Sequence, residues 1–173
     1  MFLLGGARSG KTALAVELAA KTGRQVTVIA TAEAGDEEMS ERIRLHRAER
    51  PDSWRTIEEP LDLENAIAQV DEGHALVIDC LTLWVANLLA RGDTDASVQM
   101  QGQAAAARAS SRAALTVAVS NEVGLGVVPV SELGRRYRDV LGRVNAAWAD
   151  AAAEASFVVA GRLLQLRSAD DLL

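Results

Sequence analysis

The amino terminus sets the narrowest limits on how this chain can fold. The apolar run Met1 to Leu4 leads into Gly-Gly-Ala-Arg-Ser-Gly-Lys-Thr, residues 5–12, and then into a stretch rich in alanine and leucine. This order matches the pattern G-x-x-x-x-G-K-[ST], which needs a strand before it and a helix after it. The glycines let backbone N–H groups turn toward phosphate oxygens, and the start of the helix adds positive charge. The segment therefore predicts a P-loop inside an α/β fold.

The P-loop pattern also predicts roles for its side chains. Lys11 is a candidate catalytic residue because it supplies positive charge to terminal phosphates, and Thr12 offers a hydroxyl to Mg²⁺, a hard ion that prefers oxygen ligands. The alternative is a glycine-rich turn that binds nothing, and the order of strand, loop and helix disfavours it. The nucleotide-binding residues expected in this segment are Gly5, Gly6, Ala7, Arg8, Ser9, Gly10, Lys11 and Thr12.

Length and charge narrow the class of protein. With 173 residues, 49% of them hydrophobic, we expect a single domain over 1–173 that can cover both faces of a sheet. The net charge of −6 would repel a phosphate backbone, so nucleic acid is not an expected partner. No apolar stretch is long enough to span a membrane, and the single cysteine, Cys80, cannot form an internal disulfide. We therefore expect a cytoplasmic protein.

Apolar segments alternate with helix-like segments along the rest of the chain. Buried-type strands are expected at 25–30, 75–79, 115–120 and 157–160, a short extended piece at 54–58, and helices at 13–21, 36–50, 61–70, 81–90, 99–114 and 132–154. The alanine-rich helix at 99–114 is expected on the surface, after a polar turn at 91–97. This alternation predicts a mostly parallel sheet with flanking helices and right-handed crossovers.

Two of the expected strands end in residues suited to a nucleotide site. Ligands of open α/β sheets bind at the carboxyl ends of the strands, so Ala30, Thr31 and Ala32 are expected beside the nucleotide. Asp79 closes the apolar run Ala-Leu-Val-Ile-Asp, as a Walker B aspartate does, and would hold Mg²⁺ through water opposite Thr12. An apolar strand can also end in aspartate by chance, but the P-loop upstream favours the functional interpretation.

The expected helix at 36–50 and its flank concentrate positive charge in an acidic protein. The arginines are Arg42, Arg44, Arg47, Arg50 and Arg55. They form either a local anion site or a solvated helix face, and the residues alone favour the solvated face. His46 shares one face with Met39, Ile43 and Arg50, and on the same grounds it is first of all a helix-face histidine.

Taken together, five segments resemble one family. They are GGARSGKT at residues 5–12, RIRLHRAERP at 42–51, WRTIE at 54–58, DCLTLW at 79–84 and NEVGLGVVP at 121–129. In order and spacing they resemble the CobU/CobP family, bifunctional adenosylcobinamide kinases and adenosylcobinamide-phosphate guanylyltransferases of cobalamin biosynthesis. The resemblance extends from Leu3 to about Val159. It implies a P-loop NTPase of RecA-like α/β fold, with a mostly parallel central sheet.

The resemblance also implies two reactions. ATP or GTP phosphorylates adenosylcobinamide, and GMP then passes from GTP to the new phosphate, which gives adenosine-GDP-cobinamide and pyrophosphate. The family forms a covalent guanylyl-histidine, and the matching position is His46, a reasonable nucleophile near neutral pH. Mg²⁺ is the implied cofactor, and relatives suggest a homotrimer. The further nucleotide-contacting positions implied are Ala30, Thr31, Ala32, Arg47, Ala48, Glu49, Arg50, Glu58 and Asp79.

Some alternatives stay open at this point. Glu58 could receive either the guanine N–H donors or the ribose hydroxyls. A plain small-molecule kinase would use the P-loop while His46 had only a structural role. A nucleotide-dependent switch or assembly ATPase acting on a protein partner is a third class, although no dedicated interaction segment is visible in the sequence.

Overall fold

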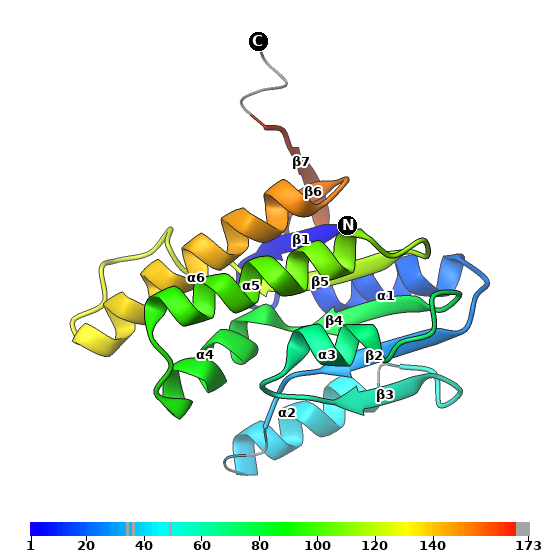
Figure 1. Cartoon of the computed structure of the whole chain (residues 1–173), viewed down its shortest axis with the longest axis horizontal. Coiled ribbons are helices and arrows are strands. Elements are labelled where there is room, and N and C mark those ends of the chain that lie inside the picture. The colour runs from blue at the N-terminus through cyan, green and yellow to red at the C-terminus, as the bar shows by residue number, and fades with distance from the viewer. Residues whose placement is uncertain (34, 36, 49, 169–173) are drawn as a thin grey trace.

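One seven-stranded sheet forms the centre of the computed structural model, which describes residues 1–33, 35, 37–48 and 50–168 (Figure 1). Its strand order is β3-β2-β4-β5-β1-β6-β7. Neighbouring strands are parallel except for β6 and β7, which pair antiparallel. The strands are β1 Phe2–Gly5, β2 Val26–Ala30, β3 Arg55–Glu58, β4 Ala75–Asp79, β5 Thr116–Asn121, β6 Ala155–Val159 and β7 Arg162–Leu166.

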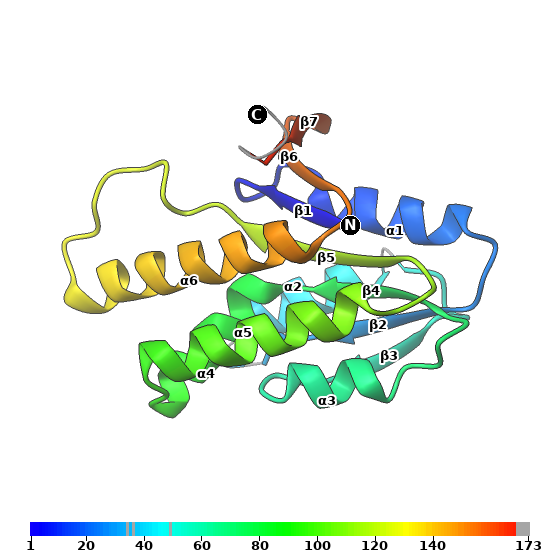
Figure 2. The ribbon, with the colours of Figure 1, turned by 45° about the horizontal axis from the view of Figure 1, so that its top comes forward.

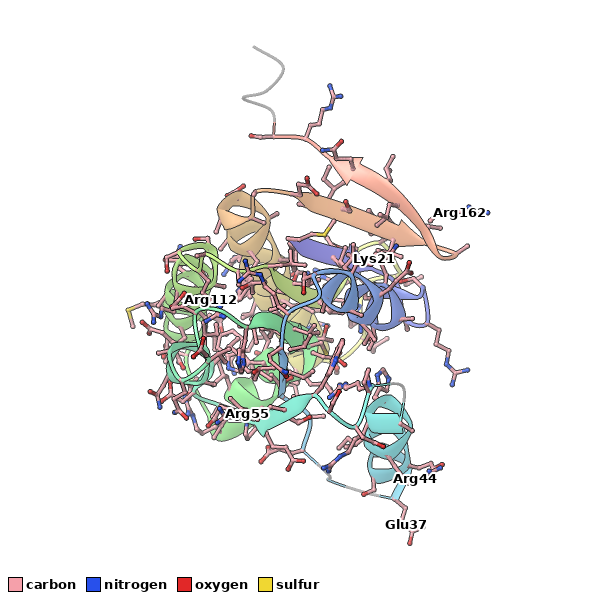
Figure 3. All side chains as sticks on the ribbon, turned by 90° about the vertical axis from the view of Figure 1, so that its right-hand side faces the viewer. Lys21, Glu37, Arg44, Arg55, Arg112 and Arg162 are labelled. Carbon is pink, nitrogen blue, oxygen red and sulfur yellow. The ribbon has the colours of Figure 1, made fainter. Side chains whose placement is uncertain are left out.

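Helices cover both faces of this sheet (Figure 2). They are α1 Lys11–Lys21, α2 Glu37–Ala48, α3 Leu63–Ala68, α4 Leu81–Arg91, α5 Asp95–Ser110 and α6 Glu132–Ala151. Helix α1 packs on one face, against β1, β4 and β5, while α4 and α6 pack on the other, with α5 lying against α3 and α6. Helix α2 lies at the β3 end of the molecule (Figure 3).

The apolar strands are buried on both faces, which explains their continuous hydrophobic runs. Because side chains alternate along a strand, Phe2 and Leu4 of β1 belong to the core under α3–α6, and Leu3 belongs to the core under α1. Local signals fix the helix ends: Ser131 accepts a hydrogen bond from the backbone N–H of Gly134 at the start of α6, and Gly92 ends α4 in the left-handed conformation.

The fold class is confirmed, but one strand was not predicted and the predictions for two helices need correction. Strand β7 was not expected, α6 ends at Ala151 rather than near Glu154, and α5 begins at Asp95 inside the stretch predicted as a turn. Helix α5 is also not a surface helix. Its buried residues are Val98, Gly102, Ala105, Ala106 and Ala109, and they pack toward α3 and α6.

The sheet order places the candidate nucleotide site. Strand β5 lies between β1 and β4, so the carboxyl ends of the P-loop strand and of the strand that ends in Asp79 are separated by one strand. The register pairs Gly5 with Asn121 and Ala30 with Asp79. Within the described part of the chain, no helix has the length and apolarity needed to cross a membrane.

Candidate active site

The P-loop joins β1 to α1 by a tight turn that depends on two glycines. Gly10 precedes α1 with a φ of 97°, a conformation that L side chains rarely adopt. At Gly5, a Cβ atom would collide with the backbone carbonyl of Val158 on the neighbouring β6. The backbone N–H of Gly161, in the β6–β7 turn, donates to the Ser9 carbonyl at 2.8 Å and steadies the loop from the same side.

Lys11 lies back over this loop. Its Nζ donates to the carbonyl oxygens of Gly5 at 2.9 Å and Gly6 at 2.6 Å, with Ser9 Oγ at 3.3 Å. The side chain is buried, and burial lowers the pKa of Lys11, against the opposing effect of the charge on Asp79. The structure thus holds a cation at the centre of the loop predicted to bind phosphate.

Asp79 brings together side chains from three elements. Its Oδ1 lies 3.5 Å from Thr12 Oγ1 at the start of α1. Its Oδ2 accepts a hydrogen bond from Arg50 Nη2 at 2.8 Å and lies 3.7 Å from His46 Nδ1. The side chains of Arg50 and Asp79 are only 8% and 10% exposed, whereas that of His46 is 40% exposed. The histidine therefore meets the aspartate with one ring nitrogen while part of the ring stays open to solvent.

The charge state of Asp79 follows from these neighbours. Burial alone would raise the pKa of Asp79, but the contact with His46 and the positive charge of Arg50 outweigh it and hold the pKa below its ordinary value. Asp79 is thus an ionised carboxylate at neutral pH. The adjacent Cys80 behaves oppositely, since burial raises its pKa to about 11 and keeps the thiol protonated.

The expected β2 residues lie beside this cluster. Thr31 is fully buried, and its hydroxyl donates to the carbonyl of Cys80 at 2.6 Å and accepts from the N–H of Cys80 at 2.9 Å. Its carbonyl accepts a hydrogen bond from Asn87 Nδ2 at 2.8 Å. The Thr31 side chain therefore ties the end of β2 to the end of β4, while Ala30 and Ala32 flank it.

The arginines of the α2 region divide into two groups. Arg50 reaches the buried carboxylate, and Arg47 lies 3.9 Å from Glu58, with both side chains 71% exposed. Arg44 pairs with Glu41 on the same helix and points outward in Figure 3. Arg44 and Arg47 thus lie on a solvated face, whereas Arg50 pairs with a buried carboxylate. Glu49 and the side chains of Met39 and Arg42 lie outside the described residues.

Two residues at the end of β5, Asn121 and Glu122, also lie near the P-loop, although the sequence assigned neither of them a role. The backbone N–H of Asn121 donates to Thr82 Oγ1 at 2.7 Å, and that of Glu122 donates to the carbonyl of Gly5 at 3.0 Å. The sequence signal was the NEVG segment after an apolar strand. The second histidine, His74, lies away from this cluster at the amino end of β4, with Nδ1 at 3.1 Å from Thr27 Oγ1.

A comparison of folds agrees with this arrangement. The crystal structure of the RadB recombinase superimposes with a TM-score of 0.51 at 18% identity, covering 90% of this chain and 72% of that one. At this level of identity the likeness concerns the fold alone, and it supports the predicted α/β class with a mostly parallel sheet.

Sequence comparisons go further. A family model, CobU, described as cobinamide kinase / cobinamide phosphate guanyltransferase, matches residues 1–166. The bifunctional adenosylcobalamin biosynthesis protein CobP of Pseudomonas aeruginosa is 46% identical over 173 residues, covering 95% of each chain. The corresponding CobU protein of Escherichia coli K12 is 38% identical, covering 93% of this chain and 96% of the relative. The P-loop, the histidine on α2 and these matches along nearly the whole length place the chain in the CobU family.

Proposed function

We propose that this chain phosphorylates the aminopropanol hydroxyl of adenosylcobinamide with ATP or GTP. It then transfers GMP from GTP to the resulting phosphate through a guanylyl group on His46. The observation that carries the proposal is the convergence on Asp79, where P-loop residue Thr12 and the nucleophile His46 face the same carboxylate at 3.5 and 3.7 Å. One nucleotide site can therefore serve a kinase step and a nucleotidyl-transfer step.

The nucleotide phosphates would lie in the loop from Gly5 to Thr12. Backbone N–H groups of the loop and the start of α1 face the phosphate oxygens, and Lys11 neutralises charge on the terminal phosphates. Thr12 and Asp79 offer hard oxygen donors that suit Mg²⁺, with Asp79 acting through water. Bound there, Mg²⁺ would neutralise charge on the β- and γ-phosphates.

In the kinase step the acceptor hydroxyl attacks the γ-phosphorus. A bond forms between the acceptor oxygen and phosphorus, the bond from phosphorus to the β–γ bridging oxygen breaks, and the nucleoside diphosphate leaves with the electron pair. The proton of the acceptor hydroxyl passes to solvent. The chain contributes positioning and charge neutralisation rather than a covalent group, so Lys11 carries most of this step.

In the second reaction His46 attacks the α-phosphorus of GTP and pyrophosphate leaves. The phosphate of adenosylcobinamide phosphate then displaces the histidine and takes the GMP group. Because Nδ1 faces Asp79, the aspartate favours the tautomer with a proton on Nδ1 and leaves Nε2 as the nucleophile. Arg50, which meets the same oxygen of Asp79 as His46, and Arg47, which follows His46 on α2, supply positive charge for the phosphates.

The remaining positions have supporting roles in this proposal. Ala30, Thr31 and Ala32, with Ala48 at the end of α2, border the nucleotide. Glu49, which follows Ala48 in the sequence, contributes to the same site. Glu58 receives either the guanine N–H groups or the ribose hydroxyls. The substrates are adenosylcobinamide, ATP and GTP. We further propose a cytoplasmic homo-oligomer, with a trimer as the form suggested by relatives.

The test replaces His46 with asparagine, which keeps polarity and approximate volume. We expect His46→Asn to retain measurable phosphorylation of adenosylcobinamide with γ-³²P GTP and to lose the acid-labile, base-stable protein label from α-³²P GTP. The matched control is His74→Asn, at the other end of β4, which should keep both activities.

The other outcomes would contradict parts of this proposal. Protein-bound label that persists in His46→Asn would move the nucleophile elsewhere, and loss of both activities would assign His46 to the shared pocket. A wild-type protein that phosphorylates adenosylcobinamide but never becomes labelled would be a plain kinase. Hydrolysis without any acceptor, with stable co-purification of another protein, would instead indicate a switch or assembly ATPase.

A further inference from the structure

The loop joining β5 to α6, residues 122–131, exposes large apolar side chains to solvent. Leu125 is 80% exposed, and Val127 and Val130 are each 97% exposed. Val128 and Leu133, the latter in the first turn of α6, are exposed as well. Of the ten large hydrophobic side chains that are exposed among the described residues, four lie in this loop and a fifth, Leu133, follows it. A concentration of this kind marks an interaction surface rather than ordinary surface composition.

The far end of the loop is held in a defined shape. Arg135 Nη1 donates to the carbonyls of Pro129 at 3.0 Å and Val130 at 2.6 Å, and so ties the loop to the first turn of α6. A Cβ atom at Gly134 would lie 2.9 Å from Pro129 Cβ, so glycine allows the proline to pack there. These contacts hold the backbone of the apolar segment next to α6.

The near end of the loop is attached to the P-loop. Glu122 N–H donates to the carbonyl of Gly5 at 3.0 Å, one residue beyond the register pair of Gly5 and Asn121. In Figures 1 and 2 the yellow-green loop extends from the carboxyl end of β5 and turns back into α6. The apolar segment thus begins within three residues of a residue that contacts the P-loop.

The acceptor has the chemistry that this surface would recognise. A corrin macrocycle presents methyl groups and neutral amide side chains around its edge, and the hydroxyl to be phosphorylated lies on a short arm of the ring. The ring must therefore rest beside the P-loop while the arm reaches the γ-phosphate. Residues 123–131 include no charged side chain, which suits a neutral and largely apolar contact.

We propose that the β5–α6 loop is the docking surface for the corrin macrocycle of adenosylcobinamide. This inference rests on the proposed function, because it locates the acceptor of that reaction. Binding at this loop is separate from the formation of guanylyl-His46, which needs only GTP. The two can therefore be measured independently in the same protein.

The experiment compares two double variants with the wild type. Leu125→Ser with Val127→Ser removes apolar surface from the loop, and Leu164→Ser with Leu166→Ser makes the same change on the exposed strand β7. For the loop variant we expect the KM for adenosylcobinamide to rise about tenfold with little change in kcat, since two apolar contacts are lost. The KM for GTP and the protein label from α-³²P GTP should stay at wild-type levels. The β7 variant should match the wild type throughout.

A second loop variant, Leu125→Met with Val127→Ile, keeps the apolar surface and should have the wild-type KM for adenosylcobinamide. An unchanged KM in the serine loop variant overturns the docking surface while leaving the proposed function intact. If the serine loop variant has an unchanged KM but an assembly mass by sedimentation equilibrium that differs from the wild type, the loop is an interface between copies of this chain. That result also overturns the docking surface. If the wild type phosphorylates no adenosylcobinamide although it becomes labelled by GTP, the proposed kinase function fails first, and the docking surface falls with it.

Discussion

Asp79 is the most constrained residue of the site, because each of its oxygens faces a different partner. Oδ1 faces Thr12, which follows the P-loop lysine, and Oδ2 pairs with Arg50 and faces His46. A buried carboxylate that loses its charge leaves the guanidinium beside it without compensation. The same residue therefore links the stability of the site to the placement of the histidine and, in the proposed function, to the binding of Mg²⁺.

Asp79→Asn should accordingly change two measurements at once. We expect a higher Mg²⁺ concentration for half-maximal kinase rate with a smaller change in nucleotide affinity, and a free energy of unfolding lower by about 3 kcal/mol. Urea unfolding and a Mg²⁺ titration of the initial rate provide the readouts. Glu17→Gln, which breaks the exposed pair with Lys21, is the control and should leave both unchanged. An unaltered Mg²⁺ titration in Asp79→Asn would remove the aspartate from the metal site.

Lys11→Ala tests the P-loop itself. Removing the cation from the loop should lower both phosphorylation of adenosylcobinamide and labelling of His46 by at least about 100-fold, because both reactions place phosphates in the same loop. Lys21→Ala is the matched control, since Lys21 is exposed at the other end of α1. Circular dichroism checks that the variants are folded. Kinase turnover near the wild-type value in folded Lys11→Ala would mean that the P-loop assignment is wrong.

Among the secondary-structure elements, the sequence predicted best the strands that are buried on both faces. Strands β2, β4 and β5 are apolar on both faces, so their hydrophobic runs were sufficient. Strand β7, Arg-Leu-Leu-Gln-Leu, was missed because its three leucines form neither a continuous apolar run nor a strict alternation, as expected for a strand whose residues are all exposed. Helix α5 was misjudged because alanine and glycine give a weak apolar pattern, although small residues are what two closely packed helices need.

The contact between α5 and α6 gives a test of that correction. A Cβ atom at Gly102 would lie 3.1 Å from Val144 Cγ2, so a large side chain there must push the helices apart. We expect Gly102→Leu to lower the free energy of unfolding by about 2 kcal/mol, even though leucine has the better helix propensity. Gly142→Leu is the matched control, because this glycine of α6 has open space around it and should gain stability. A stabilised Gly102→Leu would show that α5 packs loosely.

At the scale of the whole molecule, topology decides which predicted residues meet. The motifs alone predicted that Lys11, Thr12 and Asp79 lie near one another, because P-loop and Walker B positions have a known relation in space, and Thr12 and Asp79 do lie 3.5 Å apart. They could not place His46 against Asp79, since α2 is joined to the sheet by loops whose path no local pattern determines. The same limit applied to the β5–α6 loop. Most of its residues are apolar, and the sequence alone does not show that their side chains are exposed to solvent.

The amino-terminal ends of the central strands are joined by long-range hydrogen bonds that the sequence did not suggest. Arg112 follows α5 and is buried. It is labelled in Figure 3. Its Nη1 donates to the carbonyl of Val70 at 2.9 Å, and its Nη2 donates to those of Asp71 at 2.9 Å and His74 at 2.8 Å. One side chain therefore satisfies three backbone acceptors in the turn between α3 and β4, about forty residues away in sequence.

Arg112→Leu should keep the apolar packing of this side chain and lose all three hydrogen bonds. The carbonyl of Asp71 would keep the N–H of His74 at 3.0 Å as a donor, but those of Val70 and His74 would lose the donor that Arg112 supplies. We therefore expect the free energy of unfolding to fall by about 3 kcal/mol. The KM values for GTP and adenosylcobinamide should not change, since the P-loop lies at the other ends of the strands. Arg108→Leu, one turn earlier on α5, is the control: its side chain is partly exposed and pairs with Glu72 at 3.7 Å, so its loss should matter little. Equal urea midpoints for the two variants would show that the surrounding core holds the turn without Arg112. A raised KM in folded Arg112→Leu would show that the turn between α3 and β4 influences the candidate active site.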